Sequence, residues 1–154
     1  MNLNTVLSQD LCCILEDSSK NEVLFSLINM ITGKLSLKKD EADELTKGIF
    51  YREQLMSTGI GLGIAIPHVR FKGVSEPILA VGIRKEGIPD YKSIDDEIVK
   101  VVVMIIVGES QHKKHIRLLS IIVSMCKNKE TRKKLINASS GQEIYEIMTG
   151  HQHD

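Results

Sequence analysis

The chain has few aromatic residues and no excess of charge of either sign. Its 154 residues include three Phe, three Tyr and no Trp, which argues against a platform that stacks nucleic-acid bases or sugar rings. Twenty Lys and Arg balance twenty Asp and Glu, so the basic surface typical of nucleic-acid-binding and membrane-surface proteins is missing. We therefore expect no nucleic-acid partner.

Long apolar runs and an even set of cysteines are also missing. The longest apolar run in the second half covers residues 101–107, far below the ~20 residues that span a bilayer. No basic segment followed by an apolar one is present at the N-terminus, so we expect neither a secretory signal nor insertion into a membrane. Three cysteines, of which Cys12 and Cys13 are adjacent, indicate reduced thiols and a cytoplasmic location.

The first half of the chain shows one strand-like segment and two helical ones. Residues 11–15 have the length and apolar character of a strand. Ser19 with Glu22 forms a capping box for the helix that follows, and Gly33 is expected to end that helix. A second helix is predicted over residues 38–53 from its apolar spacing.

The second half of the chain alternates strands with helices. Residues 99–107 are β-branched and almost continuously apolar, which is typical of a central strand buried on both faces. A turn is expected at residues 87–90, and the tail from Gly150 is expected to fray. The other predicted elements are strands at 64–66 and 77–83 and helices at 112–126, 131–137 and 141–148. This alternation indicates one α/β domain whose helices cover a central sheet.

One segment joins glycines, a proline and a histidine. Residues 57–68 read Ser-Thr-Gly-Ile-Gly-Leu-Gly-Ile-Ala-Ile-Pro-His, so a glycine loop leads into a short strand that delivers His68. Glycine lets backbone amides approach a ligand closely, and Pro67 fixes its own φ and holds the carbonyl before His68. Because an imidazole is partly neutral near pH 7 and is then nucleophilic, His68 is the first catalytic candidate.

Two further residues are candidates for the same site. His115 lies near the start of the helix after the buried strand, where the helix N-terminus lowers the pKa of a ring and favours anions. Arg52 lies at the end of the second predicted helix, and its guanidinium suits phosphate geometry. The two histidines, Arg52 and the loop amides together indicate a phosphoryl-transfer site.

Plainer interpretations of these residues remain open. Any single histidine is more often a surface residue, and Arg52 and Glu53 are also compatible with a charged helix end. His112 and His115 share a helix face, but no cysteine or carboxylate at ligand spacing completes a metal site, so we expect no metal. The glycines precede a strand instead of opening a helix, and a Walker lysine is missing, so we expect no nucleotide cofactor.

The residues around His68 resemble the signature of a known family. Arg52-Glu53 and the runs 57–61 and 63–68 are similar to the IIA domain of the bacterial phosphotransferase system, of the fructose/mannitol/nitrogen type. The likeness extends over about residues 5–148. It implies a single domain with a mixed parallel and antiparallel central sheet flanked by helices, and it implies no metal or cofactor.

The resemblance also implies roles for the candidate residues. His68 would accept a phosphoryl group from the phosphocarrier protein HPr and pass it to a cysteine of a IIB domain on a separate chain, for sugar uptake. His115 would hydrogen-bond the phosphoryl group or orient His68, and Arg52 would steady the phosphate. Ser57 or Thr58 would contribute a hydroxyl.

Two alternatives accompany the transport role. In the first, the chain is a regulatory protein of the nitrogen type, whose His68 phosphorylation state controls binding to a target protein without sugar transport. In the second, the domain has lost phosphotransfer. Val69 stands where the family often has a glycine or another small residue, which would alter partner docking. Candidates for an apolar docking rim, most of which also suit a core, are Ile60, Leu62, Val69 and Phe71.

Overall fold

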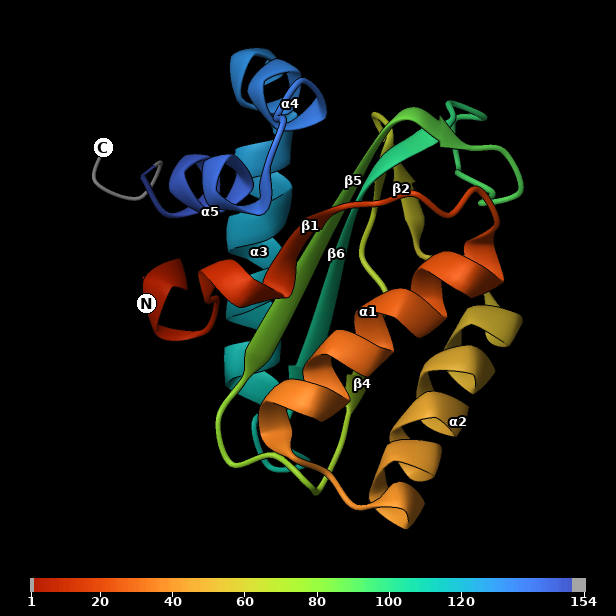
Figure 1. Cartoon of the computed structure of the whole chain (residues 1–154), viewed down its shortest axis with the longest axis vertical. Helices are drawn as coiled ribbons and strands as arrows, with labels where there is room; N and C mark the ends of the chain where they lie inside the picture. Colours follow the sequence, from red (N-terminus) through yellow and green to blue (C-terminus); the bar gives the residue numbers. More distant parts are fainter. Residues whose placement is uncertain (1, 151–154) are drawn as a thin grey trace.

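The computed structural model describes residues 2–150, which form one sheet between two groups of helices (Figure 1). This arrangement confirms the predicted α/β class with a mixed central sheet. Of the tail expected to fray, Gly150 belongs to the last helix, and residues 151–154 lie outside the described residues.

The sheet combines parallel and antiparallel strands. Its order is β1-β5-β6-β3-β2, and β4 also pairs with β6. β5 runs antiparallel to β6, whereas β3 and β4 run parallel to β6 and β1 runs parallel to β5. The strands are β1 (Cys12–Ile14), β2 (Gly59–Gly61), β3 (Ile64–Ala65), β4 (His68–Arg70), β5 (Ile78–Ile88) and β6 (Val99–Val107).

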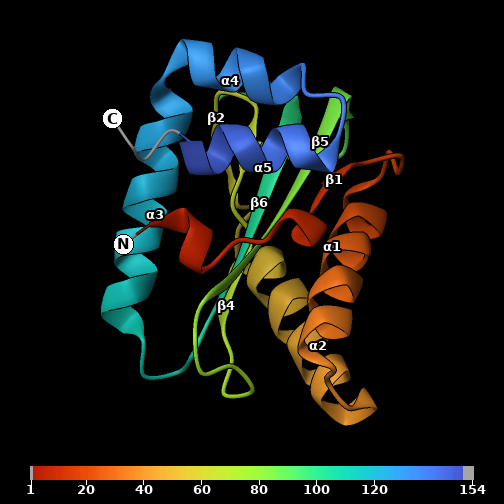
Figure 2. The same cartoon turned by 60° about the vertical axis from the view of Figure 1, so that its left-hand side comes forward.

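Helices cover both faces of the sheet (Figures 1 and 2). α1 and α2 lie on one face, and α3, α4 and α5 lie on the other. Short 3-10 turns at Leu3–Thr5 and Gln9–Leu11 precede β1. The helices are α1 (Lys20–Leu35), α2 (Lys39–Leu55), α3 (His112–Lys127), α4 (Lys129–Ile136) and α5 (Gly141–Gly150).

The predicted central strand is confirmed as β6, with both of its faces buried. Alternate side chains enter two different cores, because successive residues of a strand point to opposite faces. Val103 and Ile105 pack with residues of α3, α4 and α5. Met104 and Ile106 pack with residues of α1 and α2.

Two predicted boundaries are wrong. α1 begins after Ser19 as predicted, and the Ser19 hydroxyl accepts from the Glu22 N–H at 3.2 Å, but the helix continues through Gly33 to Leu35. It ends where Ser36 adopts a left-handed conformation with φ 52°. The strand predicted over residues 77–83 continues to Ile88, so the predicted turn at 87–90 begins only at Pro89.

The glycine segment is a narrow hairpin instead of a plain loop. β2 pairs antiparallel with β3, and the turn between them holds Leu62 at φ 60° and Gly63 at φ 78°. The Leu62 N–H donates to Asp95 Oδ2 at 2.8 Å, which fixes this turn against the loop before β6. The chain then passes through Pro67 into β4, a strand that the sequence pattern did not predict.

Candidate functional site

His68 opens β4, and its ring orientation is fixed by the backbone. Its Nδ1 lies 2.7 Å from the carbonyl oxygen of Ile66. A carbonyl only accepts, so Nδ1 carries the proton and the lone pair of the neutral ring is on Nε2. Burial lowers the pKa of His68 and the charge of Arg52 adds to this effect, whereas the Ile66 hydrogen bond and the charge of Glu53 oppose it. The ring is therefore neutral at pH 7, with a free nucleophilic nitrogen.

His115 lies beside His68 in the structure. The two ring centroids are 4.8 Å apart, and the ring planes meet at 64°. Burial, followed by the neighbouring His68 and Arg70, lowers the pKa of His115 to about 4. Its Nε2 is buried and has no hydrogen-bond partner among residues 2–150. A buried polar atom without a partner is an unusual feature that is typical of a functional site.

The topology of the sheet brings the two histidines together. β4 lies next to β6 with His68 opposite Ile105, and the Ile105 N–H donates to the Pro67 carbonyl at 2.9 Å. This bond confirms the expectation that the carbonyl before His68 is held in place. α3 follows β6 directly, and in Figures 1 and 2 β4 lies between α2 and the lower part of α3. His115, in the first turns of α3, is thus brought beside His68.

Arg52 lies on the last turn of α2 and acts electrostatically on His68. Its charge is one of the causes that lower the pKa of His68. One guanidinium N–H donates to the Met56 carbonyl at 2.7 Å, which holds the side chain over the end of α2. A guanidinium has five such donors, so others remain for an anion.

Glu53 is buried, although the sequence is compatible with an ordinary charged helix end at this residue. Its side chain is buried and accepts four hydrogen bonds or ion-pair contacts. The donors are the Thr58 N–H at 3.3 Å, the Thr58 hydroxyl, the Tyr91 hydroxyl at 3.0 Å and the Lys20 ammonium at 2.8 Å. A signal was present, because Glu53 continues the inward series of Leu45 and Ile49 at a spacing of four residues.

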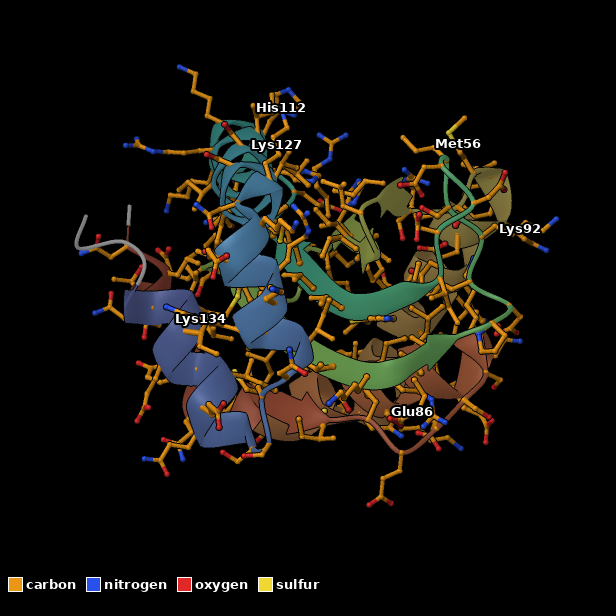
Figure 3. All side chains as sticks on the ribbon, turned by 90° about the horizontal axis from the view of Figure 1, so that it is seen from above. Met56, Glu86, Lys92, His112, Lys127 and Lys134 are labelled. Atoms are coloured by element: carbon orange, nitrogen blue, oxygen red, sulfur yellow. The ribbon has the colours of Figure 1, made fainter. Side chains whose placement is uncertain are left out.

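Of the four residues predicted for an apolar docking rim, two are exposed and two are not. Ile60 and Leu62 are 37% and 47% exposed, whereas Phe71 is buried and Val69 packs against the core under α1 and α2. Figure 3 shows Met56, which is also exposed, and His112 from α3 on the same side of the molecule. The hydroxyl candidates differ: Ser57 donates to the Lys92 carbonyl, and Thr58 is buried against Glu53.

Among residues 2–150, no group of three or more His, Cys, Asp or Glu side chains is arranged so that it could hold a metal ion. No helix in the same part of the chain has the length and apolar character needed to cross a membrane.

Comparison with known proteins gives consistent matches over almost the whole chain. Residues 6–150 match the family described as phosphoenolpyruvate-dependent sugar phosphotransferase system, EIIA 2. A fructose-specific EIIABC component from Bacillus subtilis is 34% identical over 142 residues, which are 91% of this chain but only 21% of that protein. A nitrogen regulatory protein from Pseudomonas aeruginosa is 31% identical over 135 residues, which are 88% of this chain and 86% of that protein.

Solved structures show the same fold. The crystal structure of the nitrogen regulatory protein IIA-Ntr from Neisseria meningitidis superposes with a TM-score of 0.85 at 26% identity, over 96% of this chain and 99% of that one. The mannitol IIA enzyme from Escherichia coli, solved in complex with phosphorylated IIB, superposes with a TM-score of 0.73 at 18% identity, over 94% and 99% of the two chains. The second likeness concerns the fold alone.

Proposed function

Since this chain belongs to the EIIA 2 family of the phosphotransferase system, whose members carry phosphoryl groups, we propose that His68 accepts a phosphoryl group from the phosphocarrier protein HPr. The observation that carries this proposal is the bond from Nδ1 of His68 to the Ile66 carbonyl, which leaves Nε2 unprotonated and free to attack. We propose the cytoplasm, where the expected reduced thiols would persist, as the place of this reaction.

The transfer follows directly from this ring orientation. The Nε2 lone pair of His68 forms a bond to phosphorus while the bond between phosphorus and the donor breaks, and the electron pair of that bond stays with the donor. The proton remains on Nδ1, where the Ile66 carbonyl stabilises the positive charge that the ring acquires. No proton has to leave the ring, so transfer runs readily in both directions and depends mainly on positioning.

His115 and Arg52 are proposed to stabilise the phosphoryl group. The unpartnered Nε2 of His115 lies on a ring 4.8 Å from that of His68, so a phosphoryl oxygen on His68 would supply the missing hydrogen-bond partner. This requires His115 to carry its proton on Nε2 in the phosphorylated protein. The guanidinium of Arg52 would add a fixed positive charge close to the phosphoryl oxygens.

The acceptor of the phosphoryl group defines two possible roles. We propose first that His68 passes the group to a cysteine of a IIB protein on a separate chain, in support of sugar uptake. The fructose-specific relative from Bacillus subtilis supports this role. The second candidate is regulatory: the phosphorylation state of His68 controls binding to a target protein. The length match supports it, because this chain covers 86% and 99% of two nitrogen regulatory relatives.

The first test is incubation with phosphoenolpyruvate, enzyme I and HPr, followed by intact-mass measurement. We expect a gain of one phosphoryl group that is lost in acid and is absent in His68→Ala. His112→Ala, altered on an exposed residue of α3, is the matched control and should be labelled like the wild type. His115→Ala should slow transfer, the onward step more than acceptance. Stoichiometric labelling of His68→Ala would contradict the assignment, and no labelling by an active HPr would contradict the carrier role.

The second test separates the two roles. Phosphorylated protein is mixed with IIB proteins of the same cell, and transfer to a IIB cysteine is followed by mass. Transfer at a rate comparable to acceptance from HPr supports sugar uptake. If every IIB protein fails to accept the group, the transport role is wrong. A target that binds only one phosphorylation state of His68 would then support regulation.

A further inference from the structure

A chain of hydrogen bonds leads from the buried carboxylate of Glu53 to the ring of His68. Glu53 accepts from both the N–H and the hydroxyl of Thr58. The Thr58 carbonyl accepts from the Ile66 N–H at 3.0 Å. The Ile66 carbonyl in turn accepts from Nδ1 of His68 at 2.7 Å. Three of these four hydrogen bonds use a backbone group of Thr58 or Ile66, so the chain passes through the backbone of the hairpin.

We propose that Glu53 is a positioning residue for His68. By binding Thr58 at two points, it fixes the strand edge that holds the Ile66 carbonyl, and that carbonyl decides which nitrogen of His68 carries the proton. The nucleophilic Nε2 is thus specified from the end of α2, although Glu53 itself does not touch the imidazole. The kinetic part of this inference rests on the proposed function, whereas the part that concerns the proton does not.

The site requires a carboxylate and not merely a polar side chain. Oε1 accepts from the hydroxyls of Thr58 and Tyr91, and Oε2 accepts from the Thr58 N–H and from the Lys20 ammonium. An ionised carboxylate only accepts, so it can serve four donors at once. An amide could turn its N–H groups to the two hydroxyls, which can also accept, but it would leave the Lys20 ammonium without a negative partner; only an apolar side chain removes all four contacts.

The surroundings of Glu53 explain why its position is rigid. Lys20 is the first residue of α1, its ammonium lies 4.6 Å from the ring centroid of Tyr91, and its backbone N–H donates to Asp90 at 2.7 Å. The carboxylate therefore joins α1, α2, the turn after β5 and the β2–β3 hairpin. The start of the hairpin is thus tied through Glu53 to three other segments, and His68 follows the end of the hairpin.

The experiment compares Glu53→Leu, which removes every acceptor for Thr58, with the wild type in two measurements. Nitrogen-15 shifts of the imidazole report which ring nitrogen of His68 is protonated, without any phosphoryl donor. The rate of labelling by phosphorylated HPr reports function. We expect the wild type to show a single Nδ1–H tautomer and the variant a mixture. We also expect acceptance to slow by about 10-fold to 100-fold, because small misplacements of reacting groups have effects of this size.

A control for general destabilisation is Leu45→Ala. It opens a cavity at a buried residue of α2, the helix that carries Glu53, but Leu45 is not part of the hydrogen-bond chain. It should lower the melting temperature yet keep the tautomer and rate of the wild type. If Glu53→Leu does not fold, Thr58→Val, which removes the hydroxyl, should shift both measurements in the same direction. The proposal is overturned if the tautomer and the rate stay unchanged, or if Leu45→Ala changes them equally. If the wild type is not labelled at all, the proposed function fails, and the tautomer measurement still decides the role of Glu53.

Discussion

The low pKa of His115 predicts that the protein loses stability between pH 7 and pH 5. Burial, then the neighbouring His68, lowers this pKa from 6.5 to about 4. At pH 7 the ring is neutral in both the folded and the unfolded chain. As the pH falls below 6.5, the unfolded chain binds a proton at His115 that the folded chain does not bind until the pH approaches 4. The unfolded state is then favoured, so the free energy of unfolding decreases as the pH falls.

The size of this effect can be worked out for His115 alone. One proton bound only by the unfolded state changes the free energy of unfolding by about 1.4 kcal/mol for each pH unit. From pH 6.5 to pH 5 the upper limit is thus about 2 kcal/mol. Because the residue is partly exposed and water screens its charge, we expect about 1 kcal/mol.

The assay is urea unfolding of the wild type and of His115→Asn at pH 7 and pH 5. Carboxylates that titrate in this range contribute equally to both proteins, so the difference between the two pH effects isolates His115. We expect His115→Asn to lose about 1 kcal/mol less than the wild type on acidification. His112 is only the last of the causes that lower the pKa of His115, so His112→Asn should keep most of the wild-type pH effect. Equal pH effects in His115→Asn and the wild type would refute the reasoning.

Three further predictions concern stability at pH 7, measured by urea unfolding. Lys20→Met leaves the buried carboxylate of Glu53 without its cation, so we expect a loss of about 2 kcal/mol, moderated by the partial exposure of Lys20; an unchanged midpoint would contradict this. Gly59→Ala places a Cβ 2.2 Å from the Lys92 carbonyl oxygen, and the backbone must move, so we expect a loss of about 2 kcal/mol. A variant as stable as the wild type would show that this contact relaxes freely. Gly33→Ala adds a Cβ with nothing within 4 Å inside α1, so it should stabilise by about 0.5–1 kcal/mol; any loss would argue against an unstrained helix there.

The elements that the sequence predicted well are those whose burial leaves a pattern. Residues 99–107 coincide with β6 because a strand buried on both faces must be apolar throughout. The prediction that the first helix ends at Gly33 is wrong because a helix tolerates a glycine at a modest energetic cost. β5 was predicted too short because it continues past a register shift through Gly87. A side chain at residue 87 would meet Ile98, with 2.4 Å between its Cβ and the nearest Ile98 carbon, so this glycine marks close packing inside a strand instead of a turn.

The sequence indicates candidate residues for the site, but it does not predict the strand pairing and the hydrogen bonds that bring them together. His68 stands out through the glycines and Pro67, whereas β4, with only three residues and two polar ones, has no pattern of its own and forms because β6 offers a parallel edge. The proximity of His115 follows from that pairing. The role of Glu53 depends on Thr58, Tyr91 and Lys20 converging from three segments, which no local pattern records.

The burial that destabilises the protein in acid is also what keeps both imidazoles uncharged at pH 7. An imidazole with a low pKa is a weaker base, and this weakens its attack on phosphorus, but it also makes the bond to phosphorus easier to break in the next step. In the proposed transfer His68 has to both accept and release the phosphoryl group, so its lowered pKa would favour release over tight retention. The Nε2 of His115 would favour retention of the phosphoryl group instead. This buried atom has no hydrogen-bond partner among residues 2–150, and a phosphoryl oxygen would offset the energetic cost of burying it. If this hydrogen bond is stronger in the transition state of onward transfer than in the resting phosphohistidine, its removal in His115→Ala slows onward transfer more than acceptance, as expected above.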